Sequence, residues 1–291
     1  MRAPLMLTSL FLLVGCARTS PAADAELADA MPWLFANFEG DADEVAEVLR
    51  AIETKTYVTL EMGSGDELKR SLEQNPLTEE QLADIEHPDA GLDGIVSMTV
   101  AHLSPYQGQP HAEIVMLDSQ VPVEPYSPDK YDRAFLSGDD CWLDRGCETI
   151  YTENDLIKKN FLMEVPYLFY KDFRWIDISE DDEPRWAVIA RSYMKESATG
   201  DGGNATIVQS YSIEYTIERD GRGFLAADAP EGVVVETDSQ GEGTLRMQAL
   251  WTETTFENIN VGEDMVKGTV RGGIAKNYES ADEYLEEKGE E

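Results

Sequence analysis

Few residues in this sequence combine the type and the spacing that catalysis requires. The 291 residues include three histidines, and His87, His102 and His111 are separated by fifteen and nine positions. Those spacings match no standard metal-binding motif. The stretch 221–226 fits a Gly-x-Gly-x-x-Ala dinucleotide fingerprint, but Pro230 prevents the helix that must follow it. We therefore predict no catalytic residue, no metal and no cofactor.

Two of the cysteines have the spacing of a structural disulfide. Cys141 and Cys147 have five residues between them, whereas redox-active pairs usually follow the pattern Cys-x-x-Cys. In an oxidising compartment this spacing favours a disulfide, which stabilises so short a loop by roughly 2 to 2.5 kcal/mol. The acidic residues around the pair lack the spacing of a calcium-binding loop. We predict a Cys141–Cys147 disulfide, and calcium binding by the surrounding carboxylates is the minor alternative.

The charge of the chain excludes several classes of partner. Asp and Glu number 58 against 23 Lys and Arg, which gives a net charge of −35. Nucleic acids and anionic membrane surfaces would be repelled by such a protein. The chain is nevertheless 42% hydrophobic and 9% aromatic, so it has the material for a folded core. We interpret the acidity as a solubility feature rather than as a site for a cationic partner.

The first residues have the composition of a secretory signal. Arg2 precedes an apolar run of about ten residues, which is shorter than the roughly 20 residues of a membrane-spanning helix. The run ends in Leu-Val-Gly-Cys at Cys16. The following residues up to 30 are small, polar and acidic, which is typical of a flexible tether.

This terminus resembles a bacterial lipobox. The resemblance implies cleavage after residue 15, lipid modification of Cys16 and contact with the membrane only through that lipid. Because Ala17 stands where inner-membrane lipoproteins have aspartate, it also implies the outer membrane, with the protein facing the periplasm or the cell surface. The alternative is an ordinary signal peptide followed by an unrelated cysteine.

Helix and strand patterns alternate in the first half of the folded part. An apolar stripe after Asp41 or Asp43 predicts a helix that ends at Glu53. Capping-box patterns predict two more helices, which begin at Ser64 and Thr78. Strands are predicted at 57–62, 95–102 and 111–117, and a proline-containing loop at 118–140.

The second half predicts long antiparallel strands and one long helix. In the clearest strand the side chains of Tyr211 and Tyr215 share one face, and those of Ser212 and Glu214 share the other. We expect the first face in the core and the second in water. The strands are predicted at 148–156, 158–167, 169–178, 185–196, 205–219 and 244–256, and the helix at 262–288.

A meander of strands closed by a long C-terminal helix is similar to the START-like, or helix-grip, superfamily. The resemblance implies an α+β fold in which a curved antiparallel sheet wraps the helix around an apolar cavity. We expect a single domain over 31–291, in which 148–288 carry the resemblance and 64–147 form an additional helical and loop region. A lipocalin-like barrel or another α+β sandwich would give the same pattern.

Side chains on the expected inward faces are the predicted ligand contacts, because apolar walls with a few polar groups form small-molecule sites. Gly272 and Gly273 interrupt the final helix and would permit close approach or gating. The predicted contacts are Trp175, Tyr193, Gln209, Tyr211, Tyr215, Met247, Trp251, Gly272, Gly273 and Tyr278.

The function expected from these features is that of a non-catalytic envelope lipoprotein that binds or carries an apolar small molecule or lipid. The first alternative is a scaffold lipoprotein with a filled core that meets another envelope protein. A hydrolase is the second, since paired carboxylates depend on their separation in space. A cavity of several hundred Å³ between sheet and helix would favour the carrier.

Overall fold

The structure is a computed structural model that describes residues 27–61, 71–72, 74–160, 162–180, 184–219, 243–257 and 261–289. The predicted signal peptide, Cys16 and the predicted helix start at Ser64 lie outside these residues. The helices are α1 (Leu27–Ala36), α2 (Ala42–Glu61), α3 (Glu79–Leu82), α4 (Gly108–Val115) and α5 (Glu263–Gly289). The strands are β1 (Ser71–Leu72), β2 (Val96–Ser104), β3 (Tyr131–Phe135), β4 (Thr149–Lys159), β5 (Glu164–Asp177), β6 (Trp186–Tyr193), β7 (Ala198–Thr199), β8 (Ala205–Arg219) and β9 (Gly243–Phe256).

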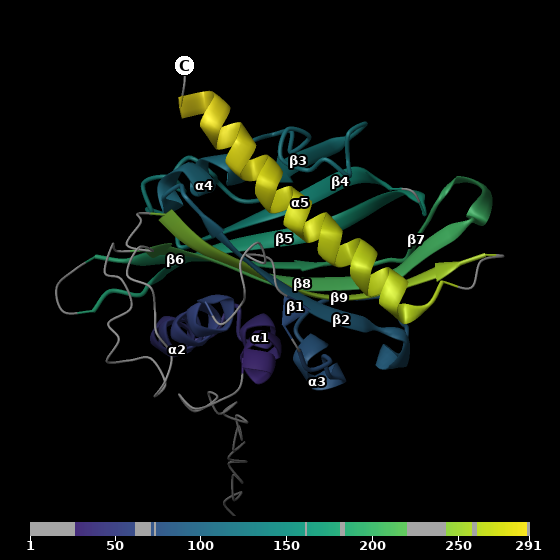
Figure 1. Cartoon of the computed structure of the whole chain (residues 1–291), viewed down its shortest axis with the longest axis horizontal. Coiled ribbons are helices and arrows are strands. Elements are labelled where there is room, and N and C mark those ends of the chain that lie inside the picture. The colour runs from purple at the N-terminus through teal and green to yellow at the C-terminus, as the bar shows by residue number, and fades with distance from the viewer. Residues whose placement is uncertain are drawn as a thin grey trace, which may run out of the picture.

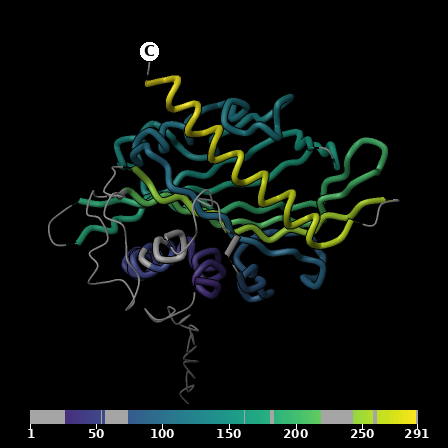
Figure 2. The backbone as a smooth tube through the Cα atoms, viewed as in Figure 1, coloured from purple at the N-terminus to yellow at the C-terminus, as the bar shows by residue number. Residues whose placement is uncertain are grey.

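All the strands belong to one antiparallel sheet with helices on both faces. The strand order is β1-β2-β9-β8-β6-β5-β4-β3, and β7 pairs with β8. Helix α5 crosses one face, and α1, α2 and α3 lie on the other (Figure 1). The chain path in Figure 2 shows that the first and last described helices therefore lie on opposite sides of the sheet. Among the described strands β1 and β3 are the two edges, so the sheet is open and differs from a lipocalin-like barrel.

The face under the N-terminal helices holds the main apolar core. Tyr211 on β8 and Trp251 on β9 are fully buried there, and both rings meet Phe35 of α1 edge to face, at 6.1 and 5.8 Å between ring centroids. Leu49 and Ile52 of α2 belong to the same cluster. Alternating residues of two long strands thus build one apolar surface, which two amphipathic helices cover.

Local hydrogen bonds explain where the first helices begin. The Asp41 carboxylate accepts hydrogen bonds from the backbone N–H groups of Asp43 and Glu44, so Asp41 caps α2. The backbone N–H of Thr78 donates to the Gln81 side chain at 2.9 Å, as the capping-box pattern predicts for α3. Helix α1 begins at Leu27, and so the last residues of the predicted tether are helical.

Two predicted strands are helices in the structure. The stretch 57–61 continues α2, although Tyr, Val and Thr favour strands, because propensity is weaker than tertiary context. The predicted strand 111–117 lies largely within α4. Pro110 sits in the first turn of α4, where its missing N–H costs nothing, and this residue is the helix signal that the strand prediction overlooked.

The remaining corrections concern strand boundaries. The three strands predicted between 148 and 178 are two, β4 and β5, and β4 pairs along its whole length with residues 164–174 of β5. The Asn160 side chain accepts hydrogen bonds from the N–H groups of Leu162 and Met163, and this turn reverses the chain where a strand was predicted. Strand β3 lies inside the stretch predicted to be a loop. The predicted sheet with a long C-terminal helix across it, the helix-grip arrangement, is confirmed.

Candidate functional site

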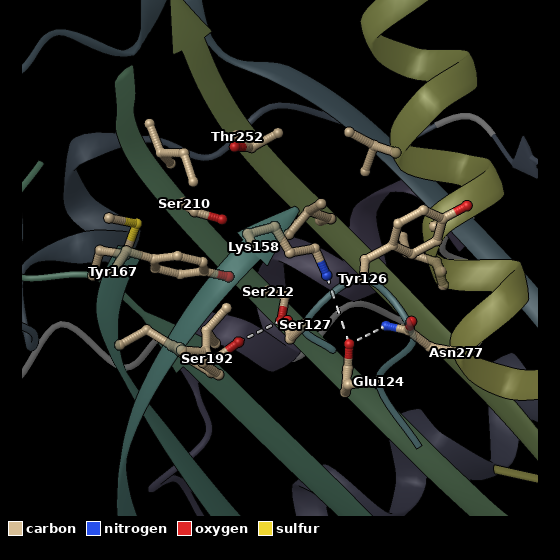
Figure 3. Close-up of a pocket in the computed structure, with 18 of the residues that line it drawn as sticks. Glu124, Tyr126, Ser127, Lys158, Tyr167, Ser192, Ser210, Ser212, Thr252 and Asn277 are labelled. Carbon is tan, nitrogen blue, oxygen red and sulfur yellow. Dashed lines mark hydrogen bonds and ion pairs between the residues drawn. The ribbon is translucent and has the colours of Figure 1, made fainter. Parts of the chain in front are cut away.

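A cavity of about 160 Å³ lies between α5 and the sheet. Thr269, Val270, Gly273 and Ile274 of α5 form its roof. Strands β6, β8 and β9 form its floor, and the loop before β3 closes one side (Figure 3). The cavity is smaller than the several hundred Å³ expected from the sequence.

The floor of the cavity is polar. It contains short hydroxyl side chains, and the oxygens of Ser192 and Ser212 lie 2.6 Å apart (Figure 3). This is the face of β8 that was predicted to be in water, so that prediction is wrong. Strict alternation separates the two faces of a strand, but it does not say what covers each face. The floor residues are Ser192, Ser210, Ser212, Glu214, Gln248, Leu250, Thr252 and Thr254.

The walls of the cavity are largely aromatic and aliphatic. Tyr131 and Phe169 contact edge to face, with ring centroids 6.0 Å apart. Burial raises the pKa of Tyr131 and Tyr167 far above the usual tyrosine value and that of Tyr193 to about 12. The three hydroxyls therefore stay protonated at neutral pH and can donate hydrogen bonds. The wall residues are Tyr126, Tyr131, Leu156, Met163, Tyr167, Phe169, Tyr193, Met194 and Ile207.

Two ion pairs lie at the end of the cavity nearest the C-terminal half of α5. Lys171 Nζ lies 2.7 Å from the Glu214 carboxylate, and both side chains are largely buried. Glu124 accepts a hydrogen bond from Asn277 Nδ2 at 2.7 Å and pairs with Lys158 at 3.6 Å. Both carboxylates thus have partners from neighbouring elements.

The roof helix is held most firmly in its C-terminal half. The Asp282 carboxylate accepts hydrogen bonds from Ser104 Oγ on β2 and from His102 Nε2, each at 2.7 Å. All the buried residues of α5 lie between Ile274 and Leu285. The turns before Ile274, which cover the cavity, contain no buried residue. The C-terminal half of α5 is therefore the anchor, and its N-terminal half is the least constrained part of the site.

The structure brings together few of the predicted ligand contacts. Tyr193 and Gly273 line this cavity, and Tyr278 lines a neighbouring one. Gly272 is exposed on α5, and a Cβ built there would meet no atom within 4 Å. Trp175 lies beyond the cavity in a cluster with Trp142.

The other predicted contacts lie on the opposite face of the sheet. Tyr211 and Trp251 pack against α1, and the Tyr215 hydroxyl lies 2.9 Å from Thr56 Oγ1 of α2. The prediction that these residues face α5 is wrong, because a second set of helices covers the apolar face and fills it. The residues concerned are Gln209, Tyr211, Tyr215, Met247 and Trp251.

The predicted Cys141–Cys147 disulfide is confirmed. It closes a loop whose Trp142 side chain is fully buried, and the backbone oxygen of Trp142 accepts a hydrogen bond from Trp175 Nε1 at 3.0 Å. The Arg145 guanidinium lies 4.9 Å from the ring centroids of Trp175 and Trp186. The loop is thus a packed cap at one end of the sheet.

Ser104, His111 and Asp282 have the composition of a hydrolytic triad but a different connectivity. His111 Nε2 lies 3.0 Å from Ser104 Oγ, yet the Ser104 hydroxyl donates to Asp282. Asp282 therefore does not orient His111 as a triad carboxylate must. Ser104 is only 1% exposed. The three residues hold α5 against β2 and α4.

Two further features concern the described residues as a whole. No group of three or more His, Cys, Asp or Glu side chains there is arranged to hold a metal ion. None of the helices in that part of the chain is both long and apolar enough to span a membrane.

Comparison with known proteins adds similarity of fold. No protein-family model matches the sequence, and no curated protein matches it significantly. The architecture is of the START-like, helix-grip type. A structure from Thermus thermophilus is similar at 11% identity and a TM-score of 0.38, over 65% of this chain and 97% of that one.

Two more solved structures are similar at the same level. Fragment 25–204 of the STAR-related lipid transfer protein from Xanthomonas axonopodis has 10% identity and a TM-score of 0.37, over 68% of this chain and 97% of its own. A conserved protein from Geobacillus kaustophilus has 8% identity and a TM-score of 0.35, over 66% and 96%. At these values the similarities carry no argument about ligand or activity.

Proposed function

We propose that this protein binds a small amphipathic molecule in the cavity under α5 and carries or presents it chemically unchanged. The observation that carries the proposal is the combination of aromatic walls with a hydroxyl-lined floor in one cavity. Small-molecule sites are commonly built in this way, because apolar walls supply affinity and a few polar groups fix orientation.

The size and polarity of the cavity narrow the ligand class. A cavity of about 160 Å³ is close to the roughly 150 Å³ of an engineered protein cavity that binds benzene. It therefore accommodates one ring or a short chain segment while α5 keeps its present position. The polar floor favours a ligand with hydrogen-bonding groups over the purely apolar one expected from the sequence.

Two adjacent glycines of α5 provide a matched test. A Cβ at Gly273 would lie 3.9 Å from the Tyr126 ring, so Gly273→Leu places a branched side chain in the roof of the cavity. Gly272→Leu makes the same change in helix propensity on the exposed side. We expect calorimetry to show that the first variant binds 1-octanol at least ten-fold more weakly and that the second binds it like the parent protein.

Equal binding by both variants would exclude the cavity as the site. Native mass spectrometry of the Cys16→Ser protein supplies an independent measurement, since a co-purifying small molecule should disappear in the Gly273→Leu variant only. A parent protein that carries no ligand and takes up no 1-octanol would favour the scaffold function.

We also propose that a lipid on Cys16 holds the domain at the outer membrane. The lipobox-like segment and the signal-like run before it support this location. Cys16→Ser should move the protein from the membrane fraction to the soluble fraction, and unchanged fractionation would overturn the proposal.

A further inference from the structure

A second cavity, of about 90 Å³, adjoins the first beneath the C-terminal half of α5. It is closed by α4, by the loop before β3 and by the anchored part of α5. The two cavities share the lining residues Glu124, Tyr131, Lys171, Glu214, Gln248 and Asn277. The two cavities are therefore adjacent, with these shared side chains between them.

Two residues present unused hydrogen-bond donors at the second cavity. Arg246 on β9 and Tyr278 on α5 both line it, and the guanidinium carbon lies 4.5 Å from the Tyr278 ring centroid. Arg246 Nε and Nη1 are buried and have no hydrogen-bond partner within the described part of the chain. The Tyr278 hydroxyl is also buried without a hydrogen-bond partner among the described residues, and Tyr278 is only 3% exposed.

The other cations that line this cavity have partners. Lys171 pairs with Glu214 at 2.7 Å. Arg133 donates to the Asn154 side chain at 2.8 Å and to the backbone oxygen of Val115 at 2.6 Å. Among the described residues no carboxylate pairs with Arg246. In a chain with a net charge of −35, a guanidinium with two buried N–H groups and no paired carboxylate is unusual.

The neighbouring histidine, His111, is neutral and adds no charge to that of Arg246. The Ser104 hydroxyl donates to Asp282, and so the hydrogen bond between Ser104 and His111 requires the proton to be on His111 Nε2. His111 Nδ1 is then a buried acceptor without a partner among the described residues. Burial, with Arg246 and His102 nearby, holds the pKa of His111 well below its usual range, so the ring is neutral.

We propose that the second cavity receives the carboxylate of an amphipathic carboxylic acid, whose apolar body occupies the larger cavity. The Arg246 guanidinium and the Tyr278 hydroxyl are the donors to the carboxylate. Hydrogen bonds between ionised partners are strong, and they are stronger still away from water. This assignment rests on the proposed ligand-binding function and adds the chemical class of the ligand.

A series of matched head groups tests the assignment on the full chain carrying Cys16→Ser. Octanoate, 1-octanol and octylamine have the same apolar chain and differ in the charge of the head. We expect calorimetry at neutral pH to give at least ten-fold tighter binding for octanoate than for octanol, with octylamine the weakest. Arg246→Met should remove the preference for octanoate over octanol. Tyr278→Phe should reduce octanoate binding several-fold.

The stability of the ligand-free variants tests whether Arg246 serves to bind a ligand or to support the fold. Arg246→Met removes a cation that has no carboxylate partner among the described residues, and the loss of its contact with the Tyr278 ring opposes this gain, so its melting temperature should stay close to that of the parent protein. Arg133→Met, the matched control in the same cavity, removes two hydrogen bonds and should lower it. An Arg246→Met protein that melts as low as the control would show a structural role and overturn the proposal.

The failure of each proposal gives a different result. If none of the three octyl compounds binds, the cavity is not a ligand site and the proposed function fails together with its extension. If all three bind alike, or if Arg246→Met keeps the preference for octanoate, the ligand site stands and its carboxylate receptor does not.

Discussion

The two faces of the central strands have opposite characters. On one face of β8, Tyr211 and Tyr215 are almost completely buried against α1 and α2. On the other face, Ser212 and Glu214 line cavities beneath α5. Both faces are covered by helices, but the two cavities lie on the second face, where they are lined by hydroxyl side chains and by donors of Arg246 and Tyr278 that have no partner among the described residues.

The two faces of the sheet contribute differently to the stability of the fold. Buried polar groups without partners each cost about 1 to 3 kcal/mol, so a face that contains them is unfavourable for folding. The filled apolar face stabilises the fold by burial and thereby permits an incompletely satisfied face on the same strands. Under the proposed function, stability and ligand recognition are thus assigned to alternate residues.

The largest expected effect is on the apolar face. Trp251→Ala should lower the free energy of unfolding by about 3 to 5 kcal/mol, because it empties a fully buried site next to Phe35. Ser212→Ala on the other face should cost no more than about 1 kcal/mol, the value of one hydrogen bond. Urea denaturation measures both. Similar losses in the two variants would abolish the distinction between the faces.

The disulfide tests whether the cap at the end of the sheet supports stability or the site. Replacing Cys141 and Cys147 by serine should lower the free energy of unfolding by about 2 kcal/mol, through the entropy of the unfolded chain. Binding of 1-octanol should stay within two-fold, roughly, because the loop packs on Trp175 and not on the cavity. A larger loss of binding than of stability would extend the site to this loop.

The smallest expected effect is a pH dependence that belongs to the α5 face. His111 stays neutral when folded but is protonated in the unfolded chain below about pH 6.5. The unfolded state therefore binds more protons there, and the free energy of unfolding should fall on acidification from about pH 6.5, by at most about 1.4 kcal/mol per pH unit.

Two variants assign this slope to one face. His111→Gln should reduce the slope, whereas His87→Gln should retain it, since His87 lies near Tyr211 on the opposite side of the sheet. Denaturation curves between pH 5 and pH 7.5, approximately, are sufficient for the comparison. Identical slopes in both variants would remove His111 as the cause.

Long regular elements were predictable from the sequence. The bounds of β8, β9 and α5 agree with the prediction to within one residue, since their alternation or periodicity extends over more than a dozen positions. Short elements were not. Residues 57–61 and α4 show strand-like composition over too few positions to outweigh the tertiary contacts that select a helix.

The site was missed because hydrophobicity was used to assign the inward face. A signal was nevertheless present, since the polar side of β8 and β9 carries more short hydroxyl residues, such as Ser210, Ser212 and Thr252, than long charged side chains. Arg246 and Tyr278 lie more than thirty positions apart in the chain, and only the crossing of α5 over β9 brings them together. The predicted disulfide needed no such information, because both cysteines lie in one short loop.

The uneven attachment of α5 has a kinetic consequence. The helix is held at Asp282, its N-terminal half over the larger cavity is only partly buried, and Gly272 and Gly273 lie at the point where bending is easiest. Local opening of this half costs a smaller part of the free energy of unfolding than opening of the core. Under the proposed function, this local opening governs ligand entry and release, and a protein with a very stable core can still exchange its ligand rapidly.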